Sequence, residues 1–74
     1  MMERYELHTA AGFLWPKEAT LYSLVELIFR DGNRPPAVGV LTGVAEAIQL
    51  DRKRLYTHEE VIAVDVLRQH KEVL

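Results

Sequence analysis

The chain has 74 residues, is 49% hydrophobic and carries a formal net charge of −2 at pH 7. This composition argues against wholesale disorder, and the negative charge argues against a protein that coats nucleic acid nonspecifically. The absence of cysteine excludes disulfides, thiolate zinc sites and thiol nucleophiles. No apolar run reaches the roughly 18 residues of a membrane span, and the start MMERYELH is unlike a signal peptide. We therefore expect one cytoplasmic domain that makes no membrane contact.

Residues 1–16 are expected to form an extended N-terminal segment. Residues 3–8, ERYELH, roughly alternate polar and apolar side chains, as a short strand does. Phe13 and Trp15 stand just before Pro16, and a proline pushes the preceding residue to extended geometry. Trp15 either covers the end of the core, or it joins Phe13 as an exposed anchor for a partner, since both residue types are enriched at interfaces.

Residues 17–74 are predicted to be a helical core, so the expected fold class is mainly α, a small three-helix domain. The first helix is placed near residues 17–30, where apolar residues recur at helical spacing after the start signal Pro16. Asp31-Gly32-Asn33 then closes this helix, and Pro35-Pro36 opens the next one. The residues of this turn each have a structural role at a helix end, so no binding function is needed to explain them.

The second helix is placed near residues 36–49. Gly39 and Gly43 fall on one stripe of it, and because glycine is unfavourable inside a helix, they suggest that another backbone packs closely there. An alternative is that AVGVL, residues 37–41, is extended instead of helical.

The third helix is placed near residues 58–71. Thr57 and Glu60 have the spacing of a capping box, in which each side chain bonds the other residue's backbone N–H. The stretch VIAVDV, residues 61–66, is rich in β-branched residues, so a strand beginning there is the alternative.

Positive charge is concentrated in the middle of the chain. Residues 27–54 hold five bases and three acids, whereas each end has an excess of acids. Arg52, Lys53 and Arg54, followed by Tyr56, form either a solvated connector or a contact patch for phosphates or an acidic protein surface. The predicted partner-binding residues are Arg52, Lys53, Arg54, Tyr56, Phe13, Trp15 and Arg34.

The residues that carry catalysis or bind metals do not form a recognisable pattern. His8, His58 and His70 do not share a metal-binding spacing, and Ser23, the only serine, has no histidine nearby in the sequence. The glycines do not form a phosphate-binding pattern either. We therefore expect neither an enzyme nor a bound cofactor or metal.

Two resemblances bear on function. RLYTHEEVIAVDVL, residues 54–67, resembles a segment of the MerR-type regulators, which implies a helix-turn-helix or winged-helix DNA binder. The preceding LTGVAEAIQLDRK lacks that family's Arg-Tyr-Tyr recognition stretch. The whole chain, above all MMERYELHTAAGFLWP and RDGNRPPAVGVLTG, is similar to a small lytic-phage regulator that binds bacterial RNA polymerase.

The second resemblance implies a protein of the host bacterial cytoplasm that inhibits or modifies transcription through protein–protein contact. A large protein partner, with RNA polymerase as the candidate, is the leading hypothesis. Nucleic acid near the basic residues Arg52 to Arg54 remains open, and the DNA-binding regulator is the alternative.

Overall fold

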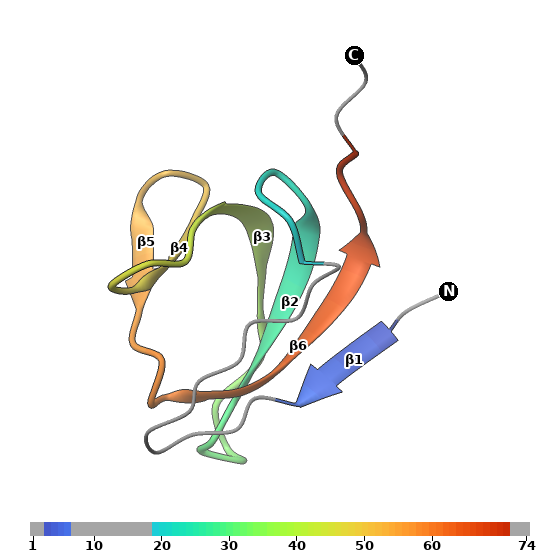
Figure 1. Ribbon diagram of the computed structural model, residues 1–74. Helices are drawn as coiled ribbons and strands as arrows, with labels where there is room; N and C mark the ends of the chain where they lie inside the picture. The colour runs from blue at the N-terminus through green and yellow to red at the C-terminus, as the bar shows by residue number, and fades with distance from the viewer. Residues whose placement is uncertain (1–2, 7–18, 72–74) are drawn as a thin grey trace.

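The structure, a computed structural model, describes residues 3–6 and 19–71, the first of these ranges by its backbone alone. Its regular structure in these two ranges is entirely β, with strands β1 (Glu3–Glu6), β2 (Leu24–Phe29), β3 (Ala37–Gly43), β4 (Ile48–Leu50), β5 (Arg54–Tyr56) and β6 (Val61–Arg68). The strands form one sheet in the order β1-β6-β2-β3-β4-β5, and every neighbouring pair is antiparallel (Figure 1).

The prediction of a mainly α, three-helix domain is wrong. Each expected helix contains strand instead: β2 lies within residues 17–30, β3 and the first part of β4 within 36–49, and β6 within 58–71. Residues 3–6 and 19–71 include no helix at all, so the expected helical core is also wrong for the described part of residues 17–74. The short N-terminal strand is present as β1.

Strand β2 shows why the spacing of its apolar residues was wrongly interpreted as helical. Its buried residues are Val25, Leu27 and Phe29, which recur every second position and face the core. The alternate positions include Leu24 and Ile28, which are half-buried. Because apolar residues occupy both faces of the strand, its period of two is hidden, and a spacing of three or four can be drawn through it just as well.

The alternatives that assigned strands to residues 37–41 and 61–66 are confirmed, since both stretches lie in strands. Strand β6 is hydrogen-bonded on both edges, to β1 and to β2, and all six positions of the segment 61–66 except Ile62 are buried. A strand enclosed in this way favours a run of valines over strict alternation, because β-branched side chains pack well on a pleated surface.

The connection between β5 and β6 forces the sheet to curl. In a flat sheet these strands would be four spacings apart, about 19 Å. The chain from Tyr56 to Val61 reaches at most about 18 Å when fully extended. It is not extended, because the backbone N–H of Glu60 donates to the carbonyl oxygen of Thr57 at 3.3 Å. Figure 1 shows the resulting curled sheet, with β6 running from the end of β5 to the far side of β2.

Strand β3 is the element that bends. It pairs with β2 along one part of its length and with β4 near its end, where the pairing shifts register between Leu41 and Gly43. Such an irregularity bends a strand and increases its twist. The bend directs β4 and β5 away from the plane of β2 and β6.

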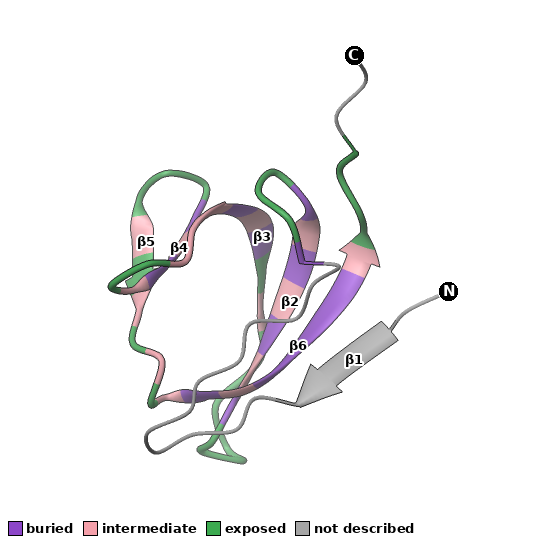
Figure 2. Cartoon of the chain, in the orientation of Figure 1, coloured by how far each residue is buried: buried purple, intermediate pink, exposed green. Residues whose placement is uncertain are grey.

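The core lies inside this curl. Figure 2 shows buried residues along β2, β3, β4 and β6 and exposed residues in the turns between them. The buried hydrophobic cluster consists of Ala19, Val25, Leu27, Phe29, Leu41, Ile48, Leu50, Val61, Val64 and Val66. The interior is therefore filled by side chains from one face of a single sheet folded upon itself.

The two glycines of the predicted helical stripe lie in β3, and both face close neighbours from another segment. A Cβ atom at Gly39 would come within 2.5 Å of Arg54 Nη2 and 3.2 Å of Leu50 Cβ, and one at Gly43 within 3.3 Å of Gln49 Cβ. Close packing against these glycines was thus correctly expected, but the neighbours come from β4 and β5 and not from a helix.

Gly39→Ala should lower the free energy of unfolding by about 1–3 kcal/mol, because the added methyl group overpacks the contact with Leu50 and displaces Arg54. Gly32→Ala is the matched control: nothing lies within 4 Å of a Cβ atom there, so its effect should stay within about 0.5 kcal/mol. Urea unfolding of both variants measures this, and equal midpoints would contradict the close contact at Gly39.

Candidate functional site

The turn between β4 and β5 presents the basic residues identified in the sequence. Asp51 and Arg52 both have left-handed backbone conformations, with φ of 55° and 64°. The backbone N–H of Lys53 donates to the carbonyl oxygen of Leu50 at 3.1 Å. Two positive φ values are typical of the type I′ turns that join hairpin strands, and because neither residue is glycine, the conformation needs support from outside the turn.

That support comes from β3. The backbone N–H of Asp51 donates to the carbonyl oxygen of Val40 at 2.8 Å, and the Asp51 carboxylate accepts the Val40 N–H at 2.9 Å. The backbone N–H of Arg52 donates to the hydroxyl of Thr42 at 2.9 Å. Each left-handed residue is thus attached to the neighbouring strand, which makes this turn a fixed feature.

Arg54 belongs to the same support. Its guanidinium donates from Nη2 to the Asp51 carboxylate and, at 2.8 Å, to the carbonyl oxygen of Val38. The hydrogen bond from Val40 and then the one from Arg54 hold the pKa of Asp51 below its usual value. Arg54 is therefore occupied by contacts within the domain.

Arg52 and Lys53 differ from Arg54. Both are exposed, and no hydrogen bond or ion pair within residues 19–71 uses either side chain. Leu55, on the adjoining strand β5, is 64% exposed. It lines a shallow hollow of about 410 Å³ together with residues 43–47, which lead from β3 to β4, and Gln49. We call Arg52, Lys53 and Leu55 the hairpin surface.

Arg34 and Tyr56 lie together, in contact with the core. The Arg34 guanidinium is 3.8 Å from the centroid of the Phe29 ring and 5.7 Å from that of Tyr56, and the two rings are 5.4 Å apart. Arg34 also forms an ion pair with Glu60. Cation–π contacts and this ion pair fasten the turn after β2 to the turn before β6.

The capping-box spacing at Thr57 and Glu60 is realised without a helix. The Glu60 N–H donates to the Thr57 hydroxyl at 3.2 Å, and the Thr57 N–H donates to the Glu60 carboxylate at 2.7 Å. The residues form a turn that leads into β6. The hydrogen bonds of the pattern are confirmed, whereas the helix expected after it is wrong.

The predicted partner-binding residues thus fall into separate groups. Arg52 and Lys53 lie together on the hairpin surface. Arg54 is bonded to Asp51 and Val38 within the domain, and Arg34 and Tyr56 brace the β5–β6 connection. Phe13 and Trp15 lie outside the described residues.

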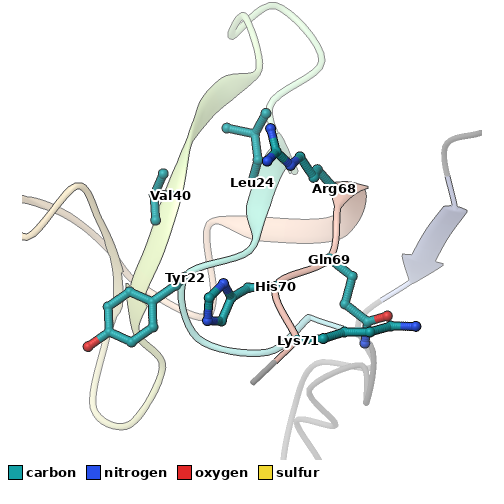
Figure 3. A pocket seen from close by; sticks show the side chains of 7 residues that line it. All are labelled: Tyr22, Leu24, Val40, Arg68, Gln69, His70 and Lys71. Atoms are coloured by element: carbon teal, nitrogen blue, oxygen red, sulfur yellow. The ribbon is translucent and has the colours of Figure 1, made fainter. Parts of the chain in front are cut away.

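A second surface, which the sequence analysis did not identify, lies where β2 begins and β6 ends. Leu24 of β2 is paired with Val40 of β3 on one side and with Arg68 of β6 on the other. Beyond them, the rings of Tyr22 and His70 meet edge to face, with centroids 5.7 Å apart. Figure 3 shows these side chains with Gln69 and Lys71 around one hollow, whose volume is about 430 Å³.

The backbone beneath this hollow is fixed by small polar side chains. The His70 N–H donates to the hydroxyl of buried Ser23 at 2.8 Å, and the Thr20 hydroxyl donates to the His70 carbonyl oxygen at 2.7 Å. Tyr22 has a φ of 72°, and its N–H donates to the Leu41 carbonyl oxygen at 2.6 Å. No pattern in the sequence predicts that these residues lie close together, because strand pairing brings together positions more than forty apart.

Two further findings concern residues 3–6 and 19–71 alone. They include no group of three or more His, Asp or Glu side chains arranged to hold a metal ion. They also include no helix with the length and apolar character needed to cross a membrane.

The Asp51→Asn, Glu60→Gln double variant should be less stable than the native protein near neutral pH and should lose less stability on acidification. Both pKa values are lowered by folding, that of Glu60 through the Thr57 N–H and then Arg34. A lowered carboxyl pKa stabilises the fold above the unfolded value, and this contribution is lost as the pH falls through the folded value. The ordinary values are 3.8 and 4.5, so the difference between the two unfolding curves should begin to shrink below about pH 5 and should keep shrinking as the pH falls through the lowered folded values.

Urea unfolding at several pH values measures this. Parallel curves, with a constant difference between the double variant and the native protein from neutral to acidic pH, would contradict a role for these two charges.

Comparisons with protein-family models, with curated proteins and with solved structures give no significant match. The geometry of the described surfaces is therefore the basis for a functional assignment.

Proposed function

We propose that this protein is a small non-catalytic binding module that docks on a large protein partner through its hairpin surface, with bacterial RNA polymerase as the candidate partner. On docking it would inhibit or modify transcription. The observation that carries the proposal is a fixed turn that presents two exposed cations beside a largely exposed leucine. Neither cation forms a side-chain hydrogen bond or ion pair within residues 19–71.

The rigidity of the turn supports docking. Asp51 and Arg52 keep unfavourable backbone conformations through hydrogen bonds to Val40 and Thr42. Strain of this kind persists where the surroundings hold it, and it is concentrated at functional sites. A turn that is ordered before binding loses little conformational entropy on binding, so more of the contact energy appears as affinity.

The chemistry of the surface favours an acidic protein partner. Arg52 and Lys53 offer charge complementarity, which speeds association and selects partners, and Leu55 offers apolar area to bury. Strand β5 stands at one end of the described strand order, so its outer edge has no strand partner within residues 19–71. An extended segment of a partner can add its backbone hydrogen bonds at such an edge.

The choice of RNA polymerase rests on the resemblance of the chain to a small lytic-phage regulator. The alternative, a helix-turn-helix or winged-helix regulator, reads DNA by placing a helix in the major groove. Residues 3–6 and 19–71 contain no helix, so they cannot supply this recognition element. Protein–protein docking is therefore the better-supported function.

The Arg52→Glu, Lys53→Glu variant should fold normally and bind purified bacterial RNA polymerase about tenfold or more weakly, a loss of about 1.4 kcal/mol. The reason is that both side chains are exposed and form no hydrogen bond or ion pair within residues 19–71. Arg68→Glu, Lys71→Glu is the matched control, because it changes the charge equally on exposed residues of the other surface. Biolayer interferometry on immobilised polymerase gives the affinities, and urea unfolding checks the fold.

Equal affinity of native protein and Arg52→Glu, Lys53→Glu would show that the hairpin surface does not contact the polymerase. Absence of binding by the native protein would remove polymerase as the partner. Arg54→Ala should behave differently from both pairs, with a lower unfolding midpoint, because Arg54 is bonded to Asp51 and Val38.

A further inference from the structure

The surface around Tyr22 and His70 is larger than the hollow in Figure 3. A second hollow, of about 690 Å³, adjoins the first and adds Leu21 and Val44. Tyr22, Gln69, His70 and Lys71 line both hollows. The two rings therefore stand between two adjacent depressions, and we call the whole the ring surface.

The charge of the ring surface is one-sided. Arg68 and Lys71 are exposed, and no hydrogen bond or ion pair within residues 19–71 uses either side chain. Among residues 19–71, those that line the two hollows include no aspartate or glutamate. The protein as a whole carries a net charge of −2. The described lining is instead cationic, which favours an anionic ligand.

The ring surface also offers flat apolar area. Tyr22 is 51% exposed, and the half-buried Leu24 and Val40 lie side by side on neighbouring strands at the floor of the first hollow. A tyrosine in the left-handed region is unusual, since bulky residues rarely adopt it. The Tyr22 N–H donates to the Leu41 carbonyl oxygen, and the adjacent Ser23 hydroxyl accepts the His70 N–H. These hydrogen bonds hold the backbone on either side of the ring, so the exposed ring has a fixed position.

We propose that the ring surface binds single-stranded nucleic acid. Bases stack on Tyr22 and His70 and pack over Leu24 and Val40, while Arg68 and Lys71 contact the phosphates on either side. Aromatic platforms combined with a cationic groove are the arrangement by which proteins bind single strands with little sequence preference, at about 1–3 kcal/mol per stacked base. Two depressions separated by a pair of rings fit successive nucleotides of one strand.

Other anionic ligands match the surface less well. A duplex keeps its bases stacked on one another, so the rings would have nothing to stack on. An acidic peptide would satisfy Arg68 and Lys71 but would leave the exposed tyrosine and the apolar floor without a flat partner. The proposal is independent of docking on polymerase, because the ring surface and the hairpin surface share no residue.

Fluorescence anisotropy with labelled twelve-nucleotide oligo(dT) and oligo(U) tests the proposal. Arg68→Gln, Lys71→Gln should weaken binding about tenfold and make the slope of log affinity against log salt shallower by about 1.4, since each phosphate contact on a single strand contributes about 0.7. Arg52→Gln, Lys53→Gln removes the same charge from the hairpin surface and should change neither quantity.

The rings are tested separately. Tyr22→Asn should also weaken binding about tenfold, because it removes the ring while asparagine tolerates the left-handed backbone. Tyr22→Phe keeps the ring and should bind within about twofold of the native protein. His70→Ala keeps the backbone groups bonded to Ser23 and Thr20, so it removes the second ring even if Tyr22→Asn fails to fold. Comparison of the two oligonucleotides shows whether the sugar or the thymine methyl group matters.

Several results would overturn the proposal. These are no binding of either oligonucleotide at low salt, native affinity of the ring variants, or an equal loss from the Arg52, Lys53 pair. Competition by a duplex or by poly-glutamate as strong as that by the unlabelled single strand would also overturn it, since either would show that charge alone is recognised. Binding of the oligonucleotides with no binding of RNA polymerase would support the ring surface while removing the proposed docking partner.

Discussion

The short connection between β5 and β6 is the constraint on which the rest of this structure depends. Four residues must carry the chain from one end of the strand order to the strand beside β2, and they can do so only because the sheet curls. The curl in turn closes the interior, so that side chains from one face of a single sheet pack against each other. Arg34, Tyr56 and Glu60 fasten this closure where the two turns meet.

The two proposed binding surfaces are built by the same physical means. In each, non-glycine residues adopt a left-handed backbone that hydrogen bonds to a neighbouring strand keep in place: Asp51 and Arg52 in one, Tyr22 in the other. Each surface then presents exposed cations whose side chains form no hydrogen bond or ion pair within residues 19–71. These arginines thus have two roles. Arg34 and Arg54 form ion pairs that hold segments together, whereas Arg52 and Arg68 are exposed to solvent.

Local features of this protein could be predicted from its sequence, but its fold could not. The mutual hydrogen bonds of Thr57 and Glu60, the turn at residues 31–33 and the crowding of Gly39 each depend on a few neighbouring residues or on one small side chain. The strands depend on pairing across the chain. In β2 and β6, both faces carry apolar residues, so the periodicity that separates strand from helix is weak.

The candidate binding surfaces show the same contrast between local features, which the sequence predicts, and features that depend on strand pairing. Arg52 and Lys53 form a visible run of charge, and their exposure could be anticipated. Arg54 belongs to the same run, yet its guanidinium reaches β3 only because Gly39 leaves space for it. The ring surface had no signature at all, because Tyr22 and His70 meet only when β2 and β6 are side by side.

The position of β6 in the sheet also governs the order in which the protein can fold during synthesis. Strand β6 lies between β1 and β2, and its pairing with β2 joins Phe29 to Val61 and Leu24 to Arg68. The ribosome makes β2 well before β6, so β1 to β5 emerge as a chain whose central partner is still missing. Non-local pairing of this kind slows folding and leaves strand edges exposed meanwhile. A nascent chain that ends before β6 should therefore remain unfolded and depend on chaperones.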